Sequence, residues 1–196
     1  MIQLIYPNEP APILPRPNVD NPGYFAAVSE EMLPVVEENF LVTGQSSRSY
    51  CHSGSGLLHP VVHLHILDRE GRLYLQKRSL TKDLLPGCWD TAVGGHVAYG
   101  EQILEALYRE SAEELSMTRF NPVAITNYIY KNSREREFIF VFACAGSFNP
   151  QPNPAEVSEG RYWTKEEIED SLGKGIMTPN FEEEYGRISQ QLYAIL

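Results

Sequence analysis

Three glutamates between residues 110 and 114 have the spacing of a metal site. Glu110, Glu113 and Glu114 share one face of any helix formed there. Carboxylates placed side by side are what a hard divalent cation such as Mg²⁺ binds, and Arg109 supplies a local counter-charge. The same cluster could be an ordinary solvated acidic face. The stretch LPGCWDTAVGGHVAYGE just before the helix favours a site, because glycine lets the backbone approach a ligand.

A helix from about residue 101 to residue 116 must carry these acids, because apolar residues recur there at helical spacing. Before it, residues 59 to 68 and residues 71 to 79 read as two strands joined by a tight turn, which predicts a hairpin. After it, residues 137 to 146 are apolar on both faces, as in a strand that is covered on each side. Strands that alternate with two or three helices indicate a single α/β domain.

Two further helices and an N-terminal extension complete the prediction. Thr164 with Glu167 has the pattern of a helix N-cap with a capping box, and residues 181 to 196 read as an amphipathic terminal helix. Six of the 14 prolines fall within the first 22 residues, where no regular period survives. We therefore expect a proline-rich extension over residues 1–32 and the folded domain over residues 33–196.

The charge balance restricts the partners of this chain. Its 16 Lys and Arg against 26 Asp and Glu give a formal net charge of -10, which repels nucleic acid and anionic membranes. The expected partner is a small molecule, and a homodimer is left open. Three cysteines without CxxC spacing indicate a reducing compartment. Because the chain shows neither a signal peptide nor a segment long enough to span a bilayer, we expect a cytoplasmic protein.

The segment from residue 95 to residue 117 resembles the Nudix box. The pattern of that box is Gly, five residues, Glu, seven residues, Arg-Glu, an apolar residue, any residue, Glu-Glu, any residue and Gly. The residues that match it are Gly95, Glu101, Arg109, Glu110, Glu113 and Glu114. Two positions differ, because Ser111 replaces an aliphatic residue and Ser116 replaces the glycine that normally lets the chain turn. The resemblance covers roughly residues 36 to 180 and implies the Nudix α/β/α sandwich with a mixed sheet.

The resemblance also implies a reaction. Nudix enzymes hydrolyse a diphosphate linked to a second moiety, with Mg²⁺ or Mn²⁺ on the box glutamates. The implied catalytic and metal-binding residues are Glu110, Glu113 and Glu114. Glu101 would be a weaker ligand or a contact that orients the helix, and Arg109 a structural partner of the glutamates. The expected substrate-binding residues are Lys77, Arg78, Gly94 and Gly95, although the two basic residues could equally be plain solvent contacts.

A closer resemblance is to the metal site of the type I isopentenyl diphosphate isomerases of this superfamily. The segments CHSGSGLLHP, LPGCWDTAVGGH and EREFIF carry it. It implies a second metal site with the ligands His52, His59, His96, Glu135 and Glu137, and Glu114 matches the helix glutamate of the isomerases. Imidazole favours a transition ion such as Zn²⁺, Mn²⁺ or Fe²⁺ over Mg²⁺. The isomerases need a cysteine where this chain has Gly94, which cannot transfer a proton.

Three functions stay open on this basis. A metal-dependent diphosphohydrolase is favoured, and the alternatives are isomerase-like activity and a ligand-binding Nudix domain without catalysis. The second metal site also has a plainer alternative, since His52 in its Ser/Gly loop could be a solvent residue and Glu135 and Glu137 a charged hairpin entry. His63 and His65 alternate with apolar residues and read as one polar face of a strand, for which we expect no role.

Overall fold

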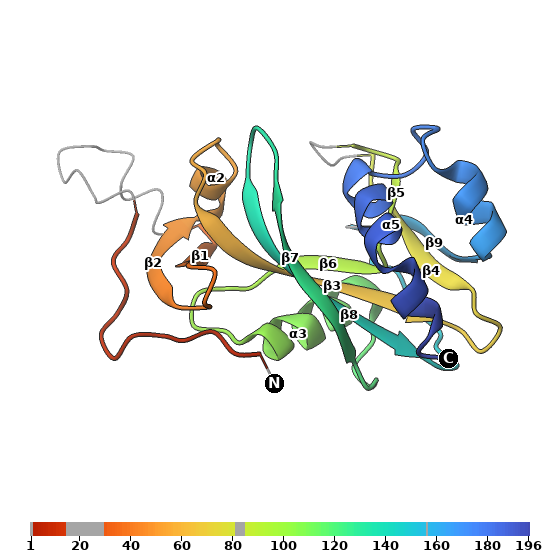
Figure 1. The fold of residues 1–196 in the computed structure, drawn as a ribbon, viewed down its shortest axis with the longest axis horizontal. Coiled ribbons are helices and arrows are strands. Elements are labelled where there is room, and N and C mark those ends of the chain that lie inside the picture. Colours follow the sequence, from red (N-terminus) through yellow and green to blue (C-terminus); the bar gives the residue numbers. More distant parts are fainter. Residues whose placement is uncertain (1, 15–29, 81–84, 156) are drawn as a thin grey trace. The chain divides into compact units, whose positions relative to one another are not determined.

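The computed structural model describes residues 2–14, 30–80, 85–155 and 157–196 (Figure 1). The chain forms two compact units. Unit 1 comprises Met1–Val62, Gly95–Ala106 and Asn127–Phe140, and unit 2 comprises His63–Gly94, Leu107–Thr126 and Val141–Leu196. Several strands and one helix contribute residues to both units.

The described elements are runs of two to four strands separated by helices, with two helices at the end. The strands are β1 (Met32–Val36), β2 (Val42–Ser47), β3 (Leu58–Leu67), β4 (Leu73–Arg78), β5 (Trp89–Asp90), β6 (Val93–His96), β7 (Val123–Lys131), β8 (Arg136–Ala145) and β9 (Val157–Trp163). The helices are α2 (Arg48–Cys51), α3 (Ile103–Leu115), α4 (Lys165–Ser171) and α5 (Pro179–Tyr193). Strands β1 and β2 form a two-stranded sheet, and the larger sheet has the order β5-β4-β3-β8-β7, with β6 paired to β3 and β9 to β4. The predicted α/β class is confirmed.

The predicted hairpin is formed by β3 and β4. The strands pair antiparallel, with Ile66 opposite Tyr74. Asp68 closes the turn, because its carboxylate accepts hydrogen bonds from the backbone N–H of Glu70 and of Arg72 at 3.0 and 2.8 Å. Gly71 has a φ of 75°, a left-handed conformation that costs glycine little. The hairpin therefore follows from local turn chemistry that the sequence already displays.

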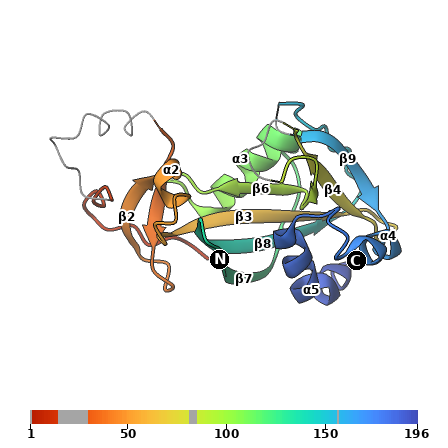
Figure 2. The same ribbon diagram turned by 90° about the horizontal axis from the view of Figure 1, so that it is seen from above.

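The predicted helices are also present. Helix α3 runs over Ile103–Leu115, two residues inside the predicted start, and Figure 2 shows α3 and α5 on opposite sides of the sheet within unit 2. Thr164 and Glu167 form the predicted capping box of α4. Helix α5 begins earlier than predicted, because the Thr178 hydroxyl accepts from the Phe181 N–H and Pro179 occupies the first turn.

The described part of the N-terminal extension, residues 2–14, lies against other segments of unit 1. Tyr6 Oη donates a hydrogen bond to the Glu101 carbonyl at 3.1 Å, and the Ala11 N–H donates to Tyr99 Oη at 2.9 Å. The rest of the predicted extension, apart from residues 30–32, lies outside the described residues. Among the helices described, none has the length and apolar character needed to cross a membrane.

Candidate functional site

Helix α3 presents the three box glutamates in unit 2. Nη1 of Arg109 donates to Glu110 at 2.8 Å and to Glu113 at 3.2 Å, so this arginine is the predicted structural partner of the acids. Glu114 instead accepts a hydrogen bond from Nε2 of Gln76 on β4 at 3.0 Å. Like charges on one helix face repel, and the arginine and the amide offset part of that repulsion.

Three further residues of the box pattern lie in or beside α3. In unit 1, Glu101 accepts a hydrogen bond from the Ala98 N–H at 3.0 Å, in the turn before α3, and its role as a weak ligand or an orienting contact stays a prediction. In unit 2, Ser111 is fully buried and its hydroxyl donates to the Leu107 carbonyl at 2.7 Å. Ser116 has a φ of 55°, the left-handed conformation for which the box usually has glycine. Both departures from the box pattern therefore keep the helix, and Ser116 does so in a backbone conformation that disfavours residues with a Cβ atom.

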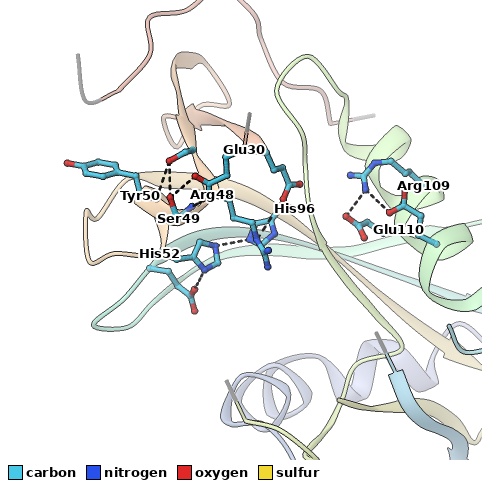
Figure 3. A network of polar contacts seen from close by, with 12 residues as sticks. Glu30, Arg48, Ser49, Tyr50, His52, His96, Arg109 and Glu110 are labelled. Atoms are coloured by element: carbon cyan, nitrogen blue, oxygen red, sulfur yellow. Dashed lines mark hydrogen bonds and ion pairs between the residues drawn. The ribbon is translucent and has the colours of Figure 1, made fainter. Parts of the chain in front are cut away.

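A second cluster lies in unit 1 and gathers four of the five residues predicted for the second metal site. These are His52, His59, His96 and Glu137, and one potential ligand atom from each lies within 4.8 Å of all the others. They come from the end of α2, the start of β3, the end of β6 and the start of β8. Among the described residues, this is the only group of three or more His, Cys, Asp or Glu side chains whose potential ligand atoms lie this close together. Nε2 of His52 lies 3.0 Å from Nε2 of His96 (Figure 3).

Two histidines of this cluster are oriented by hydrogen bonds on their outer nitrogens. Nδ1 of His52 donates to the carboxylate of Glu135 at 2.9 Å, and Nδ1 of His59 donates to the Leu57 carbonyl at 3.1 Å. The fifth predicted ligand, Glu135, thus binds the outer nitrogen of His52. The pKa of Glu135 is lowered, mainly because its carboxylate accepts this hydrogen bond from His52. Partners of this kind fix the tautomer and aim Nε2 inward.

The interior of the cluster contains an unsatisfied ring nitrogen. His59 is fully buried, and its Nε2 has no hydrogen-bond partner among the residues that the structure describes. Burial lowers the pKa of His59 to about 4, so the ring is neutral near pH 7 and, with its proton on Nδ1, carries a lone pair on Nε2. A buried polar atom without a partner is costly. The donor set of three imidazoles and one carboxylate therefore has the chemistry that a transition ion requires.

The four residues predicted to bind substrate lie in or next to β4 and β6. Nζ of Lys77 lies 3.7 Å from Oε2 of Glu159, and Nη1 of Arg78 lies 3.4 Å from Oδ2 of Asp90. Both basic residues therefore have acidic neighbours. Gly94 is exposed, whereas Gly95 is buried. That Lys77 and Arg78 contact the phosphates of a substrate stays a prediction.

A third polar cluster, in unit 2, was not expected from the sequence. His63 and His65 do share one face of β3, as expected, but that face is buried, and the two side chains are 7% and 0% exposed. Both rings bind the carboxylate of Glu184 on α5. Nδ1 of His63 lies 2.8 Å from Oε2, and Nε2 of His65 lies 2.6 Å from Oε1. Burial alone would raise the pKa of Glu184, but the two histidines lower it well below its ordinary range. A signal existed, because Glu184 shares the helical stripe of Phe181, Tyr185 and Ile188, which are buried.

Comparison with known proteins identifies close matches to this architecture. The family model of the NUDIX domain matches residues 57–181. An uncharacterized Nudix hydrolase of Streptomyces coelicolor is 30% identical over 164 residues, which cover 82% of this chain and 89% of the relative. An isopentenyl-diphosphate Delta-isomerase of Streptomyces griseus is 30% identical over 154 residues, or 73% and 76% of the two chains. The crystal structure of DR0079 from Deinococcus radiodurans has a TM-score of 0.70 at 26% identity and covers 81% of this chain and 99% of that one.

Proposed function

The chain belongs to the Nudix family and is a hydrolase, and we propose that it cleaves the diphosphate linkage of a small molecule with a divalent ion on Glu110, Glu113 and Glu114. The observation that carries this proposal is the placement of these three glutamates on helix α3, with Arg109 bound to two of them. Mg²⁺ and Mn²⁺ are the ions that such oxygen ligands favour.

The roles of the residues follow from their chemistry. An ion bound at the box would neutralise the diphosphate and make water a better nucleophile by lowering its pKa. The glutamates hold that charge in place, and Arg109 keeps two of them in fixed rotamers. Gln76 restrains Glu114 in the same way. Gly94 is exposed and has no side chain, so it lets the substrate approach the backbone beside the buried Gly95. Lys77 and Arg78 supply positive charge toward the phosphates of the substrate.

We further propose that His52, His59, His96 and Glu137 hold a second ion, a transition metal, in unit 1. The buried Nε2 of His59 supports this, because it finds no hydrogen-bond partner in the described part of the chain and a metal ion would satisfy it. Glu135 is then the residue that orients His52 rather than a direct ligand. The mixed nitrogen and oxygen donor set favours Zn²⁺, Mn²⁺ or Fe²⁺.

An isopentenyl diphosphate isomerase is the second candidate function. Two observations favour it. The histidine and glutamate cluster resembles the isomerase metal site, and two relatives at 30% identity are named isopentenyl-diphosphate Delta-isomerase. Gly94 opposes it, since a glycine cannot move a proton to or from carbon at the position where the isomerase pattern has cysteine. Interconversion of isopentenyl and dimethylallyl diphosphate by the purified protein would make this the better assignment.

A substrate screen tests the proposed function. Purified protein is incubated with Mg²⁺ or Mn²⁺ and with nucleoside diphosphate sugars, dinucleoside polyphosphates, oxidised nucleotides and prenyl diphosphates, and phosphate or nucleotide release is measured. We expect metal-dependent hydrolysis of at least one class and none in EDTA. The three cysteines of the protein are free thiols, which supports a reducing, cytoplasmic location. We therefore propose to run these assays under reducing conditions.

A further inference from the structure

The N-terminal segment, residues 2–14, precedes the residues that the Nudix family model matches, yet it is packed into unit 1. Leu4 and Ala11 are 4% and 3% exposed, so their side chains belong to the core. The Ile5 N–H donates a hydrogen bond to the Phe40 carbonyl, in the turn between β1 and β2, at 2.9 Å. Apolar burial and backbone pairing therefore hold this segment in one place.

Strand β2 has a glycine at the point where the end of this segment crosses it. The Gln45 N–H donates to the Pro12 carbonyl at 2.8 Å, and the Leu14 N–H donates to the Gln45 carbonyl at 2.7 Å. A Cβ atom built on Gly44 would lie 2.6 Å from Cδ1 of Leu14 and 3.2 Å from the Pro12 carbonyl oxygen. The close approach of the segment therefore requires glycine at this position, which shows that β2 is adapted to it.

Tyr6 binds the turn that precedes α3 through its hydroxyl group. Oη accepts a hydrogen bond from the Gly100 N–H at 3.0 Å and donates one to the Glu101 carbonyl at 3.1 Å, which a hydroxyl can do at the same time. Burial raises the pKa of Tyr6 to about 12, so the hydroxyl keeps its hydrogen at neutral pH. The Tyr6 ring also packs edge-on against Tyr99, with the ring centroids 5.6 Å apart.

The residues on either side of this pair bind the N-terminal segment as well. Tyr99 Oη accepts a hydrogen bond from the Ala11 N–H at 2.9 Å. Gln102, the last residue before α3, binds both backbone groups of Leu4: its Oε1 accepts from the N–H at 3.0 Å, and its Nε2 donates to the carbonyl at 3.3 Å. Four consecutive residues, 99–102, are thus bound to one short segment that is distant in sequence.

We propose that the N-terminal segment is a clamp on the turn 99–102, and that Tyr6 is a positioning residue for Glu101, the first glutamate of the box pattern. This inference rests on the proposed function, in which the box binds a divalent ion. The Glu101 carboxylate accepts from the Ala98 N–H at 3.0 Å, so its direction follows the conformation of the turn. Both roles predicted for Glu101, a weak ligand or a contact that orients the helix, require that conformation to be fixed.

Amide hydrogen exchange, followed by NMR, tests the clamp without any substrate. Tyr6→Phe keeps the ring and removes both hydrogen bonds, so the Gly100 amide loses its acceptor and exchanges about tenfold faster. The neighbouring Tyr99 amide donates to the Met32 carbonyl at 2.8 Å instead and keeps its rate. Equal acceleration of both amides would show that the substitution only loosens unit 1, and an unchanged rate at Gly100 would refute the clamp.

A double-mutant cycle tests whether Tyr6 acts through Glu101. The Kd for Mg²⁺ is measured by calorimetry, because Mg²⁺ favours carboxylates over imidazoles and so reports on the box rather than on the histidine cluster. Tyr6→Phe raises this Kd about threefold to tenfold, the size of one hydrogen bond, and Glu101→Gln raises it at least as much. The double variant binds Mg²⁺ no more weakly than Glu101→Gln alone, because the two side chains act as one unit.

The matched control is Tyr162→Phe in unit 2, which removes a hydroxyl that donates to the Phe148 carbonyl at 3.4 Å and leaves both measurements unchanged. A Kd for Mg²⁺ that Tyr6→Phe does not change, or effects of Tyr6→Phe and Glu101→Gln that multiply, would overturn the positioning role. Wild-type protein that binds no Mg²⁺ would instead contradict the proposed function, and the exchange rates of Gly100 and Tyr99 then decide on the clamp alone.

Discussion

Nδ1 of His52 donates a hydrogen bond to the carboxylate of Glu135 at 2.9 Å, and this pair sets the direction in which His52 faces its cluster. With the proton on Nδ1, the other ring nitrogen is directed toward Nε2 of His96, 3.0 Å away. Glu135 is fixed in turn, since Nδ2 of Asn132 donates to its second oxygen at 2.8 Å. Contacts within the protein alone therefore set the orientation of His52.

We expect protein purified without chelator to contain a bound transition ion, because the cluster offers three imidazoles and a carboxylate. The double variant His59→Ala and His96→Ala should lose this ion, and added Zn²⁺ or Mn²⁺ should no longer raise its melting temperature. Elemental analysis and thermal unfolding measure both effects. Arg134→Ala, an exposed change in the same unit, is the control and should keep the ion. Metal-free wild-type protein that Zn²⁺ and Mn²⁺ do not stabilise would contradict the site.

Glu135→Gln should weaken metal binding without abolishing it. The amide retains an oxygen that can accept from His52 but loses the charge that makes the imidazole a stronger ligand. Loss of such an orienting carboxylate typically costs about 10–100-fold in metal affinity. Competition with a chromophoric chelator measures the change. A complete loss of binding would show that Glu135 is a direct ligand, as the sequence resemblance implies.

Glu114→Gln should reduce hydrolysis by at least about two orders of magnitude with the fold intact. The amide oxygen can still accept from Gln76, so the loss would come from the missing charge on the metal rather than from packing. Turnover is compared in saturating Mg²⁺, with circular dichroism as the check on folding. Glu166→Gln on the exposed face of α4 is the matched control. Activity that survives both Glu114→Gln and EDTA would refute the metal-dependent mechanism.

Much of the fold could be predicted because it is specified locally. The β3–β4 hairpin follows from alternating residues and the Asp68 turn, and α4 follows from its capping box. The Glu184 cluster could not be predicted in this way. Glu184 is one of three consecutive glutamates, and only the packing of α5 determines that this one is buried and meets two histidines. Gln76 was missed for the same reason, since its contact with Glu114 spans 38 positions in sequence.

The predicted second metal site falls between these cases. The resemblance to the isomerase metal site implied five ligands, and the structure brings four of those side chains together. Spacing in sequence could not separate a direct ligand from an orienting partner. That distinction depends on which oxygen of Glu135 or Glu137 reaches which ring nitrogen, and the tertiary structure alone determines it.

Ser116→Gly should stabilise the protein. Ser116 has a φ of 55°, and a residue with a Cβ atom pays a steric cost in that conformation that glycine avoids. The greater flexibility of glycine in the unfolded chain offsets part of the gain, which leaves about 0.5–1 kcal/mol in the free energy of unfolding. Urea denaturation measures the difference. Ser116→Ala removes the hydroxyl but keeps the Cβ atom, so an equal gain in that variant would contradict the backbone explanation.

The free energy of unfolding of metal-free protein should depend on pH through His59. Burial lowers the pKa of His59 to about 4, below the value of about 6.5 for an exposed histidine. Between these two values the unfolded chain binds a proton that the folded protein does not, so stability falls as pH drops from about 6.5 to 4 and is fully present above 6.5. The shift corresponds to about 3 kcal/mol at about 1.4 kcal/mol per pH unit. Urea unfolding of EDTA-treated wild type and His59→Leu across this range isolates the contribution, because the other acids titrate in both proteins. A difference in stability between the two that stays constant from pH 7 to pH 4 would show that His59 titrates normally in the folded state.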